Sequence, residues 1–123
     1  MTQKQRARLY VVTLDGGSSH PEFSKFLTNV SELGGKSPDY GGITRVAIVS
    51  SRNHLENLKK AASRKVRNKR AIDVEEVTTE SVAANHRVYI GTFEYFARFN
   101  DYPAIDLAKA RSLIEEEYRR TLS

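Results

Sequence analysis

The segment from Leu9 to Asp15 constrains the fold of this chain more than any other part of it. Successive side chains of a strand point to opposite faces of its sheet. Here both faces are apolar, one carrying Leu9, Val11 and Thr13 and the other Tyr10, Val12 and Leu14. A strand that is apolar on both faces must be covered on both sides, so this segment predicts a central strand.

Two further segments rich in strand formers follow, at residues 43–49 and 72–78, and each comes after a helical pattern. The first helix is expected to begin at a capping box of Ser19 and Glu22 and to end at Gly34-Gly35. Its apolar positions, which recur at a spacing of three or four residues, are Phe23, Phe26, Leu27, Val30 and Leu33. Residues 34–42 contain four Gly and one Pro, so they predict a loop or a short irregular edge strand.

The second helix is expected to begin near Asn53, with Glu56 three residues later. Its predicted inward positions are Leu55, Leu58, Ala62 and Val66. The 27 residues from Gly16 to Gly42 and the 21 from Ser51 to Ala71 fit two right-handed crossovers. One fold class open to the chain is therefore a small alternating α/β domain with a mainly parallel sheet.

The C-terminal third predicts a fourth short strand at 87–91, a segment at 92–99 that suits either a helix or a strand, and an amphipathic helix at 103–122. The expected inward positions of that helix are Leu107, Ala110, Ile114, Tyr118 and Leu122. Six aromatic residues fall within fourteen positions: Tyr89, Phe93, Tyr95, Phe96, Phe99 and Tyr102. Core packing or a subunit interface explains them better than base stacking, and we expect a homodimer with residues 89–122 at or near its interface.

At 123 residues, the chain predicts a basic N-terminal arm at 1–8 and a single α/β domain at 9–123. It contains no Cys, which excludes a disulfide framework and thiolate chemistry. No apolar run reaches the roughly 18 residues that a membrane span requires, and the N-terminus does not resemble a signal peptide. These features predict a cytoplasmic protein.

A cluster of cations is the most pronounced charge feature. Residues 59–70 hold seven Lys or Arg and no acid, against a net charge of +5 for the whole chain. The seven are Lys59, Lys60, Arg64, Lys65, Arg67, Lys69 and Arg70. Helical faces normally mix charge signs, so a face shared by Lys60, Arg64 and Arg67 would repel itself. An anionic partner explains this cost better than solubility does, and the cluster predicts contact with the phosphates of RNA or DNA.

Asp15 ends the first strand and precedes two Gly, at a place where carboxylates often bind a metal or act as a general base. Asp-Gly is also a frequent turn pair, and the turn interpretation is favoured. His20 is near enough in the sequence to join Asp15, but the three histidines (His20, His54 and His86) share no metal-binding spacing. The sequence predicts no metal site and no cofactor, with Mg²⁺ at Asp15 as the one alternative.

The order of these segments resembles a known pattern. Tyr10-Val11-Val12-Thr13-Leu14-Asp15, a helix, the strand VAIVSS, a second helix and then IDVEEVT are similar to the ferredoxin-like fold of three related groups. These are the CRISPR-adaptation endoribonuclease-like subunit, the VapD-type toxins and the endoribonuclease antitoxins. The resemblance covers residues 9–79 and implies an α+β, ferredoxin-like two-layer sandwich, here with an added C-terminal helix. It also implies a metal or catalytic role for Asp15 and a homodimer with a basic surface on nucleic acid.

The leading functional hypothesis is a small nucleic-acid-associated protein that binds the phosphate backbone through its basic second helix. A protein–protein interaction or inhibitor module, of the kind that phages and mobile elements carry, is the alternative; it would use the aromatic residues or the C-terminal helix. A metal-dependent ribonuclease is a third hypothesis. The sequence favours binding over catalysis, because no catalytic motif matches the strength of the basic cluster.

Overall fold

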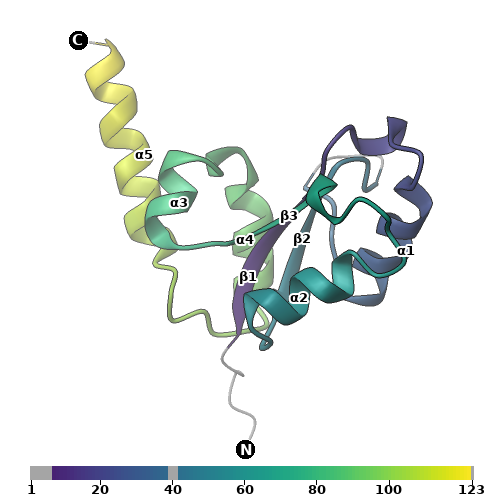
Figure 1. The fold of residues 1–123 in the computed structure, drawn as a ribbon. Helices are drawn as coiled ribbons and strands as arrows, with labels where there is room; N and C mark the ends of the chain where they lie inside the picture. Colours follow the sequence, from purple (N-terminus) through teal and green to yellow (C-terminus); the bar gives the residue numbers. More distant parts are fainter. Residues whose placement is uncertain (1–6, 39–41, 123) are drawn as a thin grey trace, which may run out of the picture. The chain divides into compact units, whose positions relative to one another are not determined.

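The computed structural model describes residues 7–38 and 42–122. The described chain forms two compact units, one made of residues 8–76 and the other of Ala7 with residues 77–122 (Figure 1). Residues 1–6 of the expected basic arm lie outside the described residues. Arg8, its last residue, begins the first strand. The expectation of a single domain stays a prediction.

The first unit is built on a three-stranded antiparallel sheet in the order β2-β1-β3. Its strands are β1 (Arg8–Leu14), β2 (Val46–Ser51) and β3 (Ile72–Glu76). Tyr10 of β1 lies opposite Val49 on one side and Glu76 on the other. The prediction that the first segment forms a central strand is confirmed.

The alternative of a mainly parallel sheet is wrong, because β1 pairs antiparallel with both of its neighbours. The physical reason lies in the connection after the first helix. At Lys36 the chain forms an isolated antiparallel bridge to Ile48, so at that point it runs in the direction of β1. It must then reverse once more before β2 begins, and this extra pass gives β2 the opposite direction to β1.

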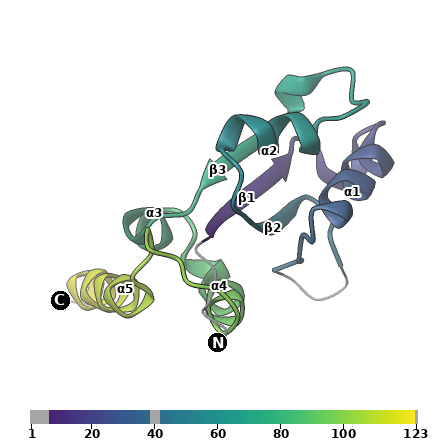
Figure 2. The ribbon, with the colours of Figure 1, turned by 90° about the horizontal axis from the view of Figure 1, so that it is seen from below.

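Two helices, α1 (Phe23–Glu32) and α2 (Leu55–Ala62), pack on the face of the sheet that carries Tyr10, Val12 and Leu14 (Figure 2). From the helices and the segment after α2, this core takes Phe26, Val30, Leu58, Ala62 and Val66, as the apolar spacing predicts. Leu55, the first residue of α2, was expected to point inward, but it is exposed.

The predicted capping box at the start of α1 is also wrong. The helix begins later, at Phe23, and Glu22 occupies the N-cap position without a capping bond from its side chain. Residues Gly17–Ser19 form a short 3₁₀ turn, η1, and the Nδ1 atom of His20 accepts a hydrogen bond from the backbone N–H of Glu22. The Glu22 carboxylate is thereby left for a different contact, described below.

The second unit is helical. It contains α3 (Thr79–Ala84), the 3₁₀ turn η3 (Arg87–Tyr89), α4 (Ile90–Ala97) and α5 (Leu107–Leu122). The predicted strand at 87–91 is wrong, and the ambiguous segment at 92–99 is largely helical. The chain turns at η3 through a bond from the Tyr89 N–H to the His86 carbonyl, which makes a continuous extended segment impossible. None of the described helices is long and apolar enough to cross a membrane.

The six clustered aromatic residues of this unit differ in burial, and Tyr89 is partly buried. Phe93, Phe96 and Tyr102 are buried, as core packing predicts, whereas Tyr95 and Phe99 are exposed and contact each other edge to face. In α5, Ala110 is buried as expected. Tyr118 and Leu122 were expected to point inward, and instead they are 64% and 70% exposed.

Candidate nucleic-acid interface

The seven clustered cations do not share a helix. Because α2 ends at Ala62, only Lys59 and Lys60 lie in it, in its last turn. Arg64, Lys65 and Arg67 lie in the connection that follows, and Lys69 and Arg70 belong to the 3₁₀ turn η2 (Lys69–Ala71). We call residues 63–70 the basic loop. The prediction that Lys60, Arg64 and Arg67 share one helical face is therefore wrong.

The loop leaves the helix through a backbone conformation that is unusual for a side-chain-bearing residue. Lys65 has a φ of 66°, in the left-handed region, and it is the one non-glycine residue in the described ranges with a positive φ. Such a conformation costs about 1–2 kcal/mol and persists where the surroundings hold it in place. The sequence gives no local sign of it, because Lys is an ordinary helix former.

Asn29 of α1 holds the end of α2 and the start of the basic loop. Its side chain is buried, and its amide nitrogen donates hydrogen bonds of 2.9 Å to the carbonyl oxygens of both Ala62 and Arg64. The last carbonyls of a helix have no partner within the helix, so this amide supplies one from outside. Sequence reasoning did not single out Asn29. The signal was a polar residue on the apolar stripe of the first helix, three residues after Phe26 and one before Val30.

Glu22 fixes the middle of the basic loop. One carboxylate oxygen accepts a hydrogen bond of 2.9 Å from the backbone N–H of Arg67, and the other accepts one of 2.7 Å from the Lys25 ammonium group. The bond from Lys25, followed by the one from Arg67, lowers the pKa of Glu22 below its ordinary value. Lys69 adds a third anchor, since its ammonium group donates to the Ser63 carbonyl at 3.1 Å. The loop is thus held by side chains at its start, middle and end.

One of the seven cations forms an ion pair with another element. The guanidinium group of Arg64 lies 2.6 Å from the Glu32 carboxylate of α1, an acid 32 positions away in the sequence. Both side chains are more than half exposed, so the pair contributes little to stability. None of the other six cations forms an ion pair with a carboxylate among residues 7–38 and 42–122.

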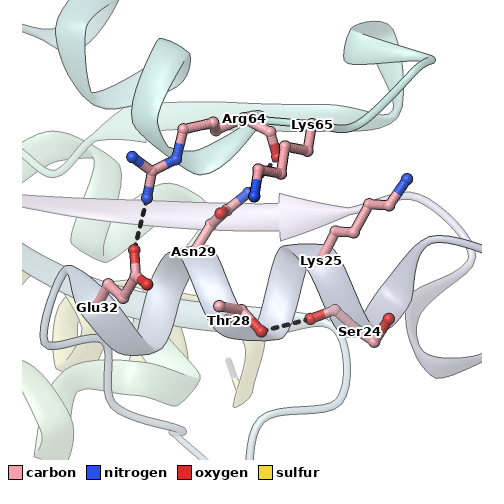
Figure 3. Close-up of a pocket in the computed structure, with 7 residues that line it drawn as sticks. All are labelled: Ser24, Lys25, Thr28, Asn29, Glu32, Arg64 and Lys65. Atoms are coloured by element: carbon pink, nitrogen blue, oxygen red, sulfur yellow. Dashed lines mark hydrogen bonds and ion pairs between the residues drawn. The ribbon is translucent and has the colours of Figure 1, made fainter.

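An open pocket of about 250 Å³ lies between α1 and the basic loop. Figure 3 shows Lys25 extending from α1 and Lys65 from the loop, with Asn29 between the two elements. Its remaining lining residues are Ser24, Thr28, Glu32 and Arg64. Of the three cationic groups in this lining, Lys25 bonds the Glu22 carboxylate and Arg64 pairs with the Glu32 carboxylate. Lys65 is therefore the cation of the pocket that pairs with no carboxylate among the described residues.

Asp15 lies elsewhere in the same unit, in the turn after β1. Its side chain is exposed, Gly16 beside it has a φ of 83°, and its backbone N–H donates to the Ala71 carbonyl at 2.7 Å. These contacts are those of a turn residue. No group of three or more His, Cys, Asp or Glu side chains in the described parts of the chain is arranged to hold a metal ion. His20, the suggested companion of Asp15, is engaged with the backbone of Glu22.

Comparison with known proteins adds no family: no family model, no curated protein and no solved structure matches this chain. The geometry of the described residues is therefore the basis for the candidate interface.

Proposed function

We propose that residues 8–76 form a ferredoxin-like domain that binds the phosphate backbone of nucleic acid through the basic loop. The observation that carries the proposal is the way in which this loop is held. Asn29, Glu22 and Lys69 fix its backbone, while the exposed loop cations Lys65, Arg67 and Arg70 have no carboxylate partner among the described residues. Cations on a fixed backbone lose less conformational entropy when they bind an anion.

The order of the strands supports the ferredoxin-like part of the proposal. In a βαββαβ arrangement, the central first strand has antiparallel neighbours on both sides, and a further strand lies outside one of them. Here β1 has an antiparallel neighbour on each side, and the isolated bridge from Lys36 to Ile48 of β2 is consistent with a further strand at that edge. The Lys36 N–H donates to the Ile48 carbonyl at 2.9 Å, and the Ile48 N–H donates back at 2.8 Å.

The distribution of charge along the chain supports a polyanion, such as the phosphate backbone of nucleic acid, as the ligand. Residues 8–76 carry 12 Lys or Arg and 8 Asp or Glu, a net charge of +4, whereas residues 77–123 carry 6 and 7, a net charge of −1. The positive charge is thus concentrated in the unit that holds the basic loop. Contacts to phosphates release condensed counterions and carry no sequence information, so the binding should be general rather than sequence-specific.

A salt titration with random RNA and with duplex DNA tests the proposal. Changing the loop residues Lys65, Arg67 and Arg70 together to Gln should weaken binding to all sequences equally. The slope of log affinity against log salt should also fall by about one unit for each lost phosphate contact. A matched control changes Lys36, Arg52 and Lys109 to Gln, which removes the same charge from exposed sites outside the basic loop.

The two triple variants separate local from general electrostatics. We expect the control to keep the wild-type salt slope, since its cations make no phosphate contact. Equal losses in both variants would mean that only net charge matters, and an unchanged slope in the basic-loop variant would refute the proposed interface. Circular dichroism of each variant confirms that the fold is intact.

A further inference from the structure

The C-terminal half of α5 carries an apolar stripe that the described chain does not cover. The first half of the helix contacts α3, and Ala110 there is fully buried. Ile114, Tyr118 and Leu122 continue the same side of the helix at four-residue spacing. Beyond Ile114 the stripe becomes exposed, and Figure 1 shows this end of α5 extending past α3.

A pocket opens at the start of this stripe. It has a volume of about 180 Å³ and lies between α5 and the chain at η3 and the start of α4. Val88, Ile90 and Ile114 provide its apolar lining, and Val88 is 78% exposed. The charged side chains that complete the lining are Arg87, Arg111 and Glu115. An apolar side chain that entered from outside would bury both itself and Val88.

The charges around the stripe change sign at Tyr118. Residues 115–117 are all Glu, and residues 119 and 120 are both Arg. Two such helices packed in parallel would place the Glu side chains of one copy against those of the other, and the Arg side chains likewise. An antiparallel pair places the three Glu of each helix beside Arg119 and Arg120 of the other, so this surface is complementary to itself in the antiparallel orientation only.

We propose that a second copy of this chain covers the stripe, through an antiparallel pair of α5 helices related by a two-fold axis at Tyr118. In this register Tyr118 meets Tyr118 of the second copy, and Ile114 meets Leu122. Leu122 of the second copy then lies over the pocket that Val88, Ile90 and Ile114 line, and fills it as a knob fills a hole. Glu115, on one flank of the stripe, lies beside Arg119 of the second copy.

Light scattering measures the assembly directly. The wild-type chain should return about twice its mass of 13.9 kDa at micromolar concentration. Tyr118→Glu should return the monomer mass, because it places a carboxylate at the centre of the pair. A wild-type mass that stays monomeric on concentrating the sample refutes the dimer.

Cysteine cross-linking tests the register, and the chain is well suited to it because it contains no Cys. Tyr118→Cys should form a disulfide-linked dimer rapidly on oxidation, since the thiol at position 118 lies opposite the same thiol of the second copy. Ser112→Cys is the matched control, because Ser112 is exposed and lies away from the stripe. It should cross-link only at the slow collisional rate.

A pair of further variants fixes the direction of the helices. Ile114→Cys alone should not cross-link, because in the proposed register the two copies of residue 114 lie eight residues, or about 12 Å, apart along the axis. Combined with Leu122→Cys it should cross-link well. Efficient cross-linking of Ile114→Cys alone would indicate a parallel pair of helices. Equal cross-linking rates for Tyr118→Cys and Ser112→Cys would mean that the stripe is not a contact between copies. Either result overturns the proposal.

Discussion

Asn29→Ala is the most direct test of how the basic loop is held. The change removes one buried amide that donates to two carbonyl oxygens, those of Ala62 and Arg64. The bond to the Ala62 oxygen is buried, and an unsatisfied buried acceptor costs about 1–3 kcal/mol. The bond to the Arg64 oxygen is partly buried, so water replaces it and the net loss there is about 0.5–1 kcal/mol. The total is a loss of roughly 1.5–4 kcal/mol in the free energy of unfolding.

Urea denaturation followed by circular dichroism measures this loss. With a slope of about 2 kcal/mol per molar urea, the midpoint should fall by roughly 1–2 M while the slope stays constant. Thr28→Ala is the matched control on the same helix. Its hydroxyl is exposed and bonds only the carbonyl of Ser24 within α1, so its loss should change stability by no more than about 0.5 kcal/mol.

A second measurement on the same variant separates loop geometry from charge. Asn29→Ala removes no cation, so nucleic-acid binding should weaken while its salt slope stays at the wild-type value. Asn29→Asp should lose at least as much stability at neutral pH, because it replaces the donor with an acceptor opposite two carbonyls. If the free energy of unfolding of Asn29→Ala lies within about 0.5 kcal/mol of the wild-type value, Asn29 does not hold the basic loop as described.

Two further predictions concern carboxylates of the same unit. The lowered pKa of Glu22 means that its contacts stabilise the fold above the ordinary Glu value of 4.5 and are lost as the pH falls below it towards the lowered pKa. The Arg67 amide, protected by Glu22 at neutral pH, should therefore exchange faster with solvent in Glu22→Ala at pH 7, and an unchanged exchange rate would contradict the contact. For Asp15, a turn residue, we expect no Mg²⁺- or Mn²⁺-dependent cleavage of RNA above buffer in the wild type, and Asp15→Asn should alter stability alone. Metal-dependent cleavage that disappears in Asp15→Asn would instead establish a catalytic role.

The sequence by itself determined the elements whose burial follows a local period. The first strand, apolar on both faces, is central in the sheet, and the apolar spacing of the first two helices identifies Phe26, Val30 and Leu58 as core residues. These predictions hold because hydrophobic periodicity is a property of consecutive residues and does not depend on which partner covers them.

The tertiary structure decided the features that depend on contacts between residues far apart in the sequence. The segment at 87–91 has the composition of a strand, but composition alone does not supply a neighbouring strand, and the chain turns into α4. The antiparallel direction of β2 depends on the bridge between Lys36 and Ile48, which no local pattern announces.

The same holds for the candidate interface. The sequence located the seven cations, but the end of α2, the pairing of Arg64 and the shape of the basic loop depend on α1. Asn29 reaches the Ala62 carbonyl across 33 positions, and Glu22 reaches the Arg67 N–H across 45. Hydrogen bonds and ion pairs between such positions form only once the core has brought both helices onto the same face of the sheet, and for that reason the sequence alone did not reveal them.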